Sequence, residues 1–203
     1  MTKSKKEVVL TFSIITIFFT SMFQTSCNSV SEEYTTRLDT LDQKLKINAE
    51  LLSIDFATIE TREKAIIKEL RYMRKYYDQT YSQELGNNLT KYKGIRKAYS
   101  NFIKNYPIVF NEMKALEKQA VDLRISVNNN DIDKPAFKQY YQTELTDVNN
   151  NLAFSERITQ SIHALEPEYQ RISDSVRNVL RELADSNPEF RQELERDSAV
   201  NKQ

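Results

Sequence analysis

An apolar repeat of seven residues between positions 92 and 127 restricts the fold of this chain more than any other feature. The first and fourth places of each heptad are apolar or aromatic throughout. The first places hold Tyr92, Tyr99, Tyr106, Met113, Ala120 and Val127, and the fourth places hold Ile95, Phe102, Val109, Leu116 and Leu123. On a helix, this spacing produces one continuous apolar stripe. The repeat therefore predicts a long helix that packs lengthwise against other helices.

Two other long stretches carry the same spacing. Residues 31 to 85 contain a seven-residue row formed by Leu38, Leu45, Leu52, Ile59, Ile66 and Met73. Residues 134 to 185 contain a comparable row, which continues to residue 190 and is formed by Tyr141, Val148, Ile162, Tyr169, Val176, Leu183 and Phe190. Each pattern predicts a helix with one apolar face. The chain is therefore expected to form three long helices.

Capping and turn-forming residues predict where these helices begin and end. Gly86 is expected to end the first helix, because glycine is common just beyond a helix C-terminus. The asparagine-rich segment 128–133 predicts a loop, and Asp133 with Pro135 predicts the start of the third helix. The segment 185–188 is expected to end that helix.

The composition favours helices over sheets. Only two glycines and four prolines occur in 203 residues, whereas sheet proteins need turn-forming residues at short intervals. Short connections between long helices place neighbours antiparallel. The expected fold is all-α: an elongated antiparallel three-helix bundle with coiled-coil-like heptad packing. Pro107 is expected to kink the second helix without ending it, and Pro167 interrupts the third in the same way.

The N-terminal residues differ in character from the rest of the chain. Residues 1–7 are basic and polar, residues 8–23 are apolar and uncharged, and the polar residues 24–26 lead directly to Cys27. This order is typical of a secretory signal peptide. The apolar run is shorter than the roughly 20 residues that a membrane-spanning helix requires.

Residues 1–27 resemble the signal peptides of bacterial lipoproteins. In that family a lipobox places an aliphatic residue, a small residue and then Gly, Ala or Ser before a cysteine that receives a diacylglycerol. Thr25, Ser26 and Cys27 match the last three places, whereas Gln24 stands where leucine is usual. Looser lipoboxes of this kind are similar to those of Bacteroidetes-type bacteria. The resemblance implies lipidation of Cys27 and a location at a membrane of the cell envelope, with the outer membrane favoured.

The resemblance of residues 1–27 and the apolar rows of the remaining chain together divide the sequence into four parts. We expect a signal peptide at 1–26, a lipidated tether at 27–33, a helical bundle at 34–185 and a charged C-terminal tail at 186–203. In the alternative interpretation, the signal segment stays uncleaved as an anchor helix and Cys27 is an incidental thiol. Both interpretations place the N-terminus at a membrane.

Unequal helix lengths suggest surfaces for partners. The three expected helices have about 55, 39 and 52 residues, which gives roughly 80, 60 and 80 Å. A shorter second helix would leave apolar side chains without a partner at one end of each long helix, and unpartnered apolar stripes in water mark binding surfaces. The residues concerned are Leu38, Leu41 and Leu45 in the first helix and Val176, Val179 and Leu183 in the third. These ends are expected to bind another envelope protein or a second copy.

The eleven tyrosines are the other unusual feature of the composition. Most are expected to pack in the core or at its boundary. Tyr76 and Tyr81 could instead line an aromatic groove near Gly86, because tyrosine combines a large contact area with a polar tip. Replacing both by alanine would then reduce partner binding.

No pattern in the sequence indicates catalysis. The only histidine, His163, has Gln160 three residues before it, so the Glu-x-x-His pairs of di-iron bundles are absent. The sequence contains neither a glycine-rich phosphate loop nor a nucleophile elbow. The 29 basic and 29 acidic residues leave no positive excess for nucleic acid. We therefore expect no catalytic residue, metal or cofactor.

The expected function is that of a membrane-anchored, non-enzymatic scaffold, spacer or adaptor for protein partners. The alternative is a ligand-binding or sensor module of the cell envelope, in which the bundle holds a small apolar or aromatic molecule between its helices. Fold class alone does not decide between them.

Overall fold

The computed structural model describes residues 32 to 200 of the chain, and side chains as far as residue 197. Within this range the chain forms helices and no strand. The helices are α2 (Glu32–Leu51), α3 (Phe56–Tyr76), α4 (Gln83–Asn128), α5 (Lys134–Ser186) and α6 (Pro188–Val200). The predicted all-α class is confirmed.

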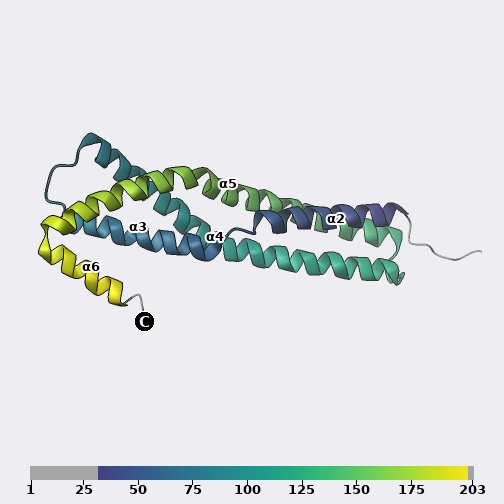
Figure 1. The fold of residues 1–203 in the computed structure, drawn as a ribbon. Helices are drawn as coiled ribbons and strands as arrows, with labels where there is room; N and C mark the ends of the chain where they lie inside the picture. Colours follow the sequence, from purple (N-terminus) through teal and green to yellow (C-terminus); the bar gives the residue numbers. More distant parts are fainter. Residues whose placement is uncertain (1–31, 201–203) are drawn as a thin grey trace, which may run out of the picture.

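The helices form an elongated molecule (Figure 1). α2 and α3 follow one another in nearly the same direction, α4 runs back along both, and α5 returns beside α4. α6 then folds back from the end of α5 (Figure 1). One end of the molecule therefore holds the start of α2 and the α4–α5 connection, and the far end holds the α3–α4 connection and the start of α6.

The expected first helix over residues 31 to 85 is wrong, because the chain breaks between Leu51 and Phe56. Asp55 caps the new helix, since its carboxylate accepts a hydrogen bond from the Thr58 backbone N–H at 3.1 Å. Leu52 and Ile59 are nevertheless both buried. The seven-residue row crosses the break without a change of phase, which is why spacing alone did not reveal it.

The expected turn at Gly86 is also wrong. α3 ends at Tyr76, and α4 begins at Gln83, where the Ser82 hydroxyl accepts a hydrogen bond from the Leu85 N–H at 3.2 Å. Gly86 therefore lies inside α4, which has 46 residues against 53 in α5. This longer second helix removes most of the expected mismatch in length.

The predicted boundaries of the last long helix are confirmed. Asp133 is its N-cap and accepts a hydrogen bond from the Ala136 N–H at 2.9 Å, with Pro135 in the first turn. Asn187 is its C-cap. α4 continues through Pro107 and α5 through Pro167, and α4 changes direction along its length in Figure 1.

The seam residues of the 92–127 repeat are buried, apart from Tyr106, which is partly buried. They belong to two apolar clusters. The smaller cluster joins α2 to residues 116–127 of α4 and 137–148 of α5. The larger cluster joins α3 and α6 to residues 85–113 of α4 and 158–180 of α5.

A polar layer lies where the two clusters meet. The Asn48 amide of α2 donates to Asn151 Oδ1 of α5 at 2.5 Å, and the Asn151 amide donates to the Val109 carbonyl and to Glu112 of α4 at 3.2 and 2.8 Å. Asn48 and Asn151 are 0% and 2% exposed. This network ties three helices together at one level, and a buried amide can fix the alignment of packed helices in this way.

Candidate functional site

Cys27 and the expected signal peptide at 1–26 lie outside the described residues. Among the helices that the structure describes, none combines the length and the apolar character that a bilayer span requires. The expected tether and tail overlap helices in part, since α2 begins at Glu32 and α6 continues to Val200.

The leucines at the start of the first helix do not lack a partner, so that expectation is wrong. Leu38, Leu41 and Leu45 are 2%, 0% and 4% exposed. They pack in the smaller cluster against Leu116, Leu123, Val148 and other residues of α4 and α5. They are buried because α3 ends at Tyr76, well before the expected turn at Gly86, so that α4 and α5 both reach far enough to pack against α2.

The apolar side chains at the end of α5 are covered as well. Val176 is fully buried, and Val179 and Leu183 are partly buried against the larger cluster. α3 and α6 supply the cover on this side, since Tyr72 and Phe190 belong to the same cluster. The expectation that this end overhangs is therefore wrong, because residues 188–200 fold back as a helix.

The structure separates the two tyrosines of the expected aromatic groove. Tyr76 is buried and its ring lies 4.7 Å from that of Phe190 in α6, so it faces an internal contact. Tyr81 lies in the α3–α4 connection, is 40% exposed, and stacks on Tyr77 with the ring centroids 4.9 Å apart. Only Tyr81 faces a surface hollow that includes Gly86.

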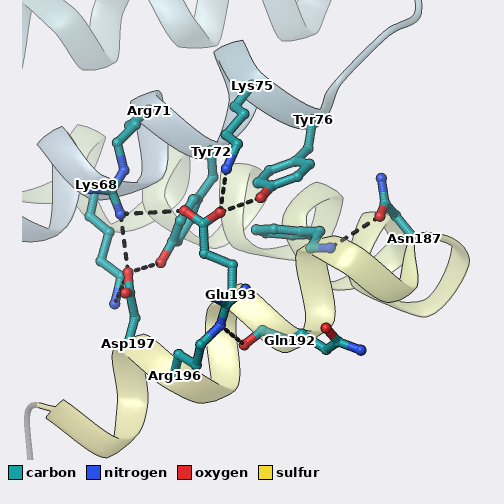
Figure 2. Close-up of polar contacts among 11 residues, drawn as sticks. Lys68, Arg71, Tyr72, Lys75, Tyr76, Asn187, Gln192, Glu193, Arg196 and Asp197 are labelled. Atoms are coloured by element: carbon teal, nitrogen blue, oxygen red, sulfur yellow. Dashed lines mark hydrogen bonds and ion pairs between the residues drawn. The ribbon is translucent and has the colours of Figure 1, made fainter.

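α6 is held against α3 by one buried aromatic ring and two carboxylates. Phe190 is 0% exposed and contacts the rings of Tyr72 and Tyr76. Figure 2 shows Glu193 and Asp197 pointing toward the basic and tyrosine side chains of α3. Glu193 pairs with Lys75 at 2.5 Å and accepts a hydrogen bond from the Tyr76 hydroxyl.

Asp197 makes the second set of polar contacts between the two helices. It accepts a hydrogen bond from the Tyr72 hydroxyl and pairs with Lys68 at 3.3 Å and Arg71 at 3.1 Å. Burial, reinforced by the hydrogen bond to Asp197, raises the pKa of Tyr72 to about 12. The hydrogen bond from Tyr72 and the neighbouring cations lower the pKa of Asp197 below its ordinary value.

A crevice of about 570 Å³ lies beside the break between α2 and α3, facing α5. We call it the break crevice. Its apolar lining consists of Ile47, Leu51, Ile54, Ile59 and Ile162, and its polar lining includes Glu50, Asp55, Arg62, His163 and Glu166. His163 is exposed at its edge, as expected for a surface residue.

The partly buried ion pair of Arg62 and Glu166 is the main charged feature of the break crevice. Burial alone would raise the pKa of Glu166, but the hydrogen bond from Arg62 lowers it below its ordinary value. The Arg62 guanidinium also lies 4.8 Å from the centre of the Tyr169 ring. These contacts fix the position of the Arg62 side chain in the break crevice.

No group of three or more His, Cys, Asp or Glu side chains within the described range is placed to hold a metal ion. Comparisons with protein-family models, with curated proteins and with solved structures find no match.

The sequence interpretation missed the break crevice and the docking of α6. Ser53 and Asp55 were the available signal for the break, because both residue types favour helix caps. Phe190 was the signal for α6, since it continues the seven-residue row of α5 beyond the expected end of the bundle. The polar character of its neighbours made the segment resemble a tail.

Proposed function

We propose that this protein is a lipid-anchored, non-enzymatic scaffold of the bacterial envelope that acts as a spacer or adaptor for protein partners. In this proposal α2 and α3 together form the first arm of an elongated antiparallel three-helix bundle with heptad packing. The observation that carries the proposal is the arrangement of the ends. α2 begins at Glu32, only a few residues after Cys27 in the sequence, at the opposite end of the molecule from α6 and the α3–α4 connection.

A cysteine anchor would leave the far end well away from the bilayer. α5 has 53 residues, which corresponds to about 80 Å at 1.5 Å per residue. The acyl chains of a lipoprotein contribute roughly 0.8 kcal/mol per buried methylene, so several chains hold a protein firmly at a membrane. The far end, where Ile67 and Tyr81 are exposed, is the part best placed to meet a partner.

Intact mass of the full chain, expressed in a bacterium and extracted with detergent, tests this proposal. Loss of residues 1–26 together with a lipid-sized increase in mass on the Cys27 peptide supports it. Cys27→Ser is the matched control and should yield neither change. A full-length, unmodified wild-type chain would refute the lipid anchor.

A ligand-binding module is the second candidate, and the break crevice favours it. The crevice has apolar walls and a partly buried ion pair, a combination common in small-molecule sites. Small amphipathic molecules should then slow limited proteolysis of the chain. Ile47→Glu, which charges the wall of the crevice, should abolish this protection, whereas Ile108→Glu at an exposed site of α4 should preserve it. Equal protection of both variants would exclude the crevice.

A further inference from the structure

Two adjoining hollows form a groove between α3 and α4 near the far end of the molecule. Their volumes are about 430 and 380 Å³, and they share Leu70, Arg74 and Lys93. Tyr81, Gly86 and Leu89 line the first hollow, and Ile67 and Arg96 line the second. We call this surface the α3–α4 groove.

The charged residues that line the α3–α4 groove all carry a positive charge. They are Arg71 and Arg74 on α3 and Lys93 and Arg96 on α4, one helical turn apart on each side. Arg71 pairs with Glu193 and Asp197 of α6. Arg74, Lys93 and Arg96 are exposed, and none of them forms an ion pair with a described side chain.

No acidic residue lines the α3–α4 groove, although the chain has equal numbers of acidic and basic residues. Some basic side chains of α4 outside the groove do pair with carboxylates of other helices: Lys91 pairs with Glu168 at 2.7 Å, and Arg124 pairs with Asp39 and Asp42 at 2.8 and 2.7 Å. The groove therefore concentrates positive charge that the chain does not neutralise itself, and such surfaces attract partners of opposite charge.

The same groove has an apolar component. Leu70, Met73 and Leu89 lie along it, and two large side chains are exposed beside them, Ile67 at 43% and Tyr81 at 40%. A Cβ atom added at Gly86 would meet nothing within 4 Å, so this stretch of α4 leaves open space. An apolar strip flanked by cations fits an amphipathic partner better than a purely ionic one.

The contacts of α6 show which types of side chain bind the neighbouring side of α3. It binds Lys68, Arg71 and Lys75 through two carboxylates, Glu193 and Asp197. Its Phe190 packs on the rings of Tyr72 and Tyr76. An acidic helix with an apolar face thus already occupies one side of α3, while the groove on the α4 side is open.

We propose that the α3–α4 groove docks an acidic amphipathic helix from a partner protein. The apolar face of that helix packs on Ile67, Leu70 and Tyr81, and its carboxylates pair with Arg74, Lys93 and Arg96. The groove follows α3 from Ile67 to Arg74, which is about 10 Å, so about two turns of a helix fill it. This inference rests on the proposed adaptor function, whose partner class it names, but it does not require the lipid anchor.

A designed peptide tests the proposal directly. The probe is a helical peptide of about 18 residues with leucine along one face and glutamate on both flanks, titrated against the full chain in detergent. Arg74→Glu/Lys93→Glu should weaken binding about tenfold or more, because it reverses two charges of the groove. Lys104→Glu/Lys118→Glu makes the same charge change at exposed positions of α4 outside the groove and should leave binding within about twofold.

A charge swap separates docking from unfolding. A second peptide with lysine in place of every glutamate should bind the wild-type chain more weakly than the acidic peptide, and it should bind Arg74→Glu/Lys93→Glu more tightly than the acidic peptide does. An unfolded variant would bind neither peptide with this preference. Recovery of binding through the swap therefore supports the proposal.

Several outcomes would overturn it. These are equal affinity of the acidic peptide for the groove and control variants, or no binding at about 100 μM. Tighter groove-dependent binding of a single-stranded oligonucleotide or of anionic phospholipid vesicles would assign the groove to phosphate instead. Self-association that depends on Arg74 and Lys93 would assign it to a second copy. The mass measurement on Cys27 is independent, so a missing lipid with intact peptide binding would refute only the anchor.

Discussion

Asn48 and Asn151 occupy places that the surrounding apolar rows would give to aliphatic residues. Asn48 follows Leu41 by seven residues, and Asn151 precedes Ile158 by seven. The sequence identified the apolar positions of these rows correctly, and nearly all of them are buried. It did not identify the amide pair, because an isolated asparagine in a helical pattern is usually solvent-exposed and only the approach of α2 to α5 buries both.

Replacing Asn151 by leucine should destabilise the protein by about 1–3 kcal/mol, because the Asn48 amide would remain buried without its partner. The double variant Asn48→Leu/Asn151→Leu should recover most of this loss. Urea denaturation of the two single variants and the double variant measures the coupling. Asn150→Leu, at an exposed neighbouring position, is the control and should change stability by less than about 0.5 kcal/mol. Additive losses in the double variant would contradict the pairing.

α6 depends on fewer buried contacts than any other helix described. Its 13 residues contribute one fully buried side chain, Phe190, and one partly buried apolar side chain, Leu194, and its ion pairs with α3 are partly exposed. Such an element can detach while the rest of the molecule stays folded. Sequence patterns could not predict its docking site, because one aromatic residue and two carboxylates do not specify which helix they contact.

Phe190→Ala should release α6 from α3 and leave the rest of the molecule folded. Removing a buried aromatic ring costs about 3–5 kcal/mol, which is a large loss for a helix anchored by one such side chain. Hydrogen exchange should show lost protection in residues 188–197, while α4 and α5 keep theirs. Glu195→Ala, at an exposed position of α6, should leave protection unchanged. Full protection of α6 in Phe190→Ala would show that its polar contacts suffice.

Acid should also release α6. The hydrogen bonds and ion pairs from Lys75 and Tyr76 lower the pKa of Glu193 below its ordinary 4.5, and those from Tyr72 and Lys68 lower the pKa of Asp197 below 3.8. Because both values are lowered, this stabilisation is complete above about pH 5 and is lost as the pH falls through the native values. Protection of α6 measured by hydrogen exchange should therefore fall between about pH 5 and pH 2.

The variant Glu193→Gln/Asp197→Asn controls for other acid effects. It should already show weakened docking of α6 at neutral pH, and the pH dependence of α6 protection should largely disappear. If the variant keeps the wild-type pH profile, other groups control the release.

Across the whole molecule, the sequence predicted the all-α class and the alternating direction of the long helices. It did not predict the lengths of the helices or the surfaces that they leave exposed. The heptad rows specify which faces are buried, but the first row continues unchanged through the break at residues 53–55. The misplaced turn at Gly86 then produced apparent overhangs at Leu38 and Val176 that the folded chain does not have. The groove near Gly86 was anticipated only through Tyr81, because its cations come from two helices whose alignment the sequence does not fix.

Small-angle X-ray scattering of residues 28–203 without lipid checks the overall dimensions. The longest dimension should be about 80–90 Å, which corresponds to the 53 residues of α5 plus the connections at its ends. A value near twice this length would indicate end-to-end dimers. A value below about 60 Å would mean that the long helices fold onto themselves.

The break between α2 and α3 has a mechanical consequence. If the protein were anchored at Cys27 and bound by a partner at the α3–α4 groove, a pulling force would act along the length of the molecule. The covalent path from Cys27 to α3 passes through residues 53–55. Tension would have to slide α2 along α4 and α5 and rupture the hydrogen bond between Asn48 and Asn151 before this segment could stretch. The polar layer would therefore resist the sliding of α2 along its neighbours under such a force. A force large enough to break this hydrogen bond would extend the molecule at the break between α2 and α3 and leave the far end folded.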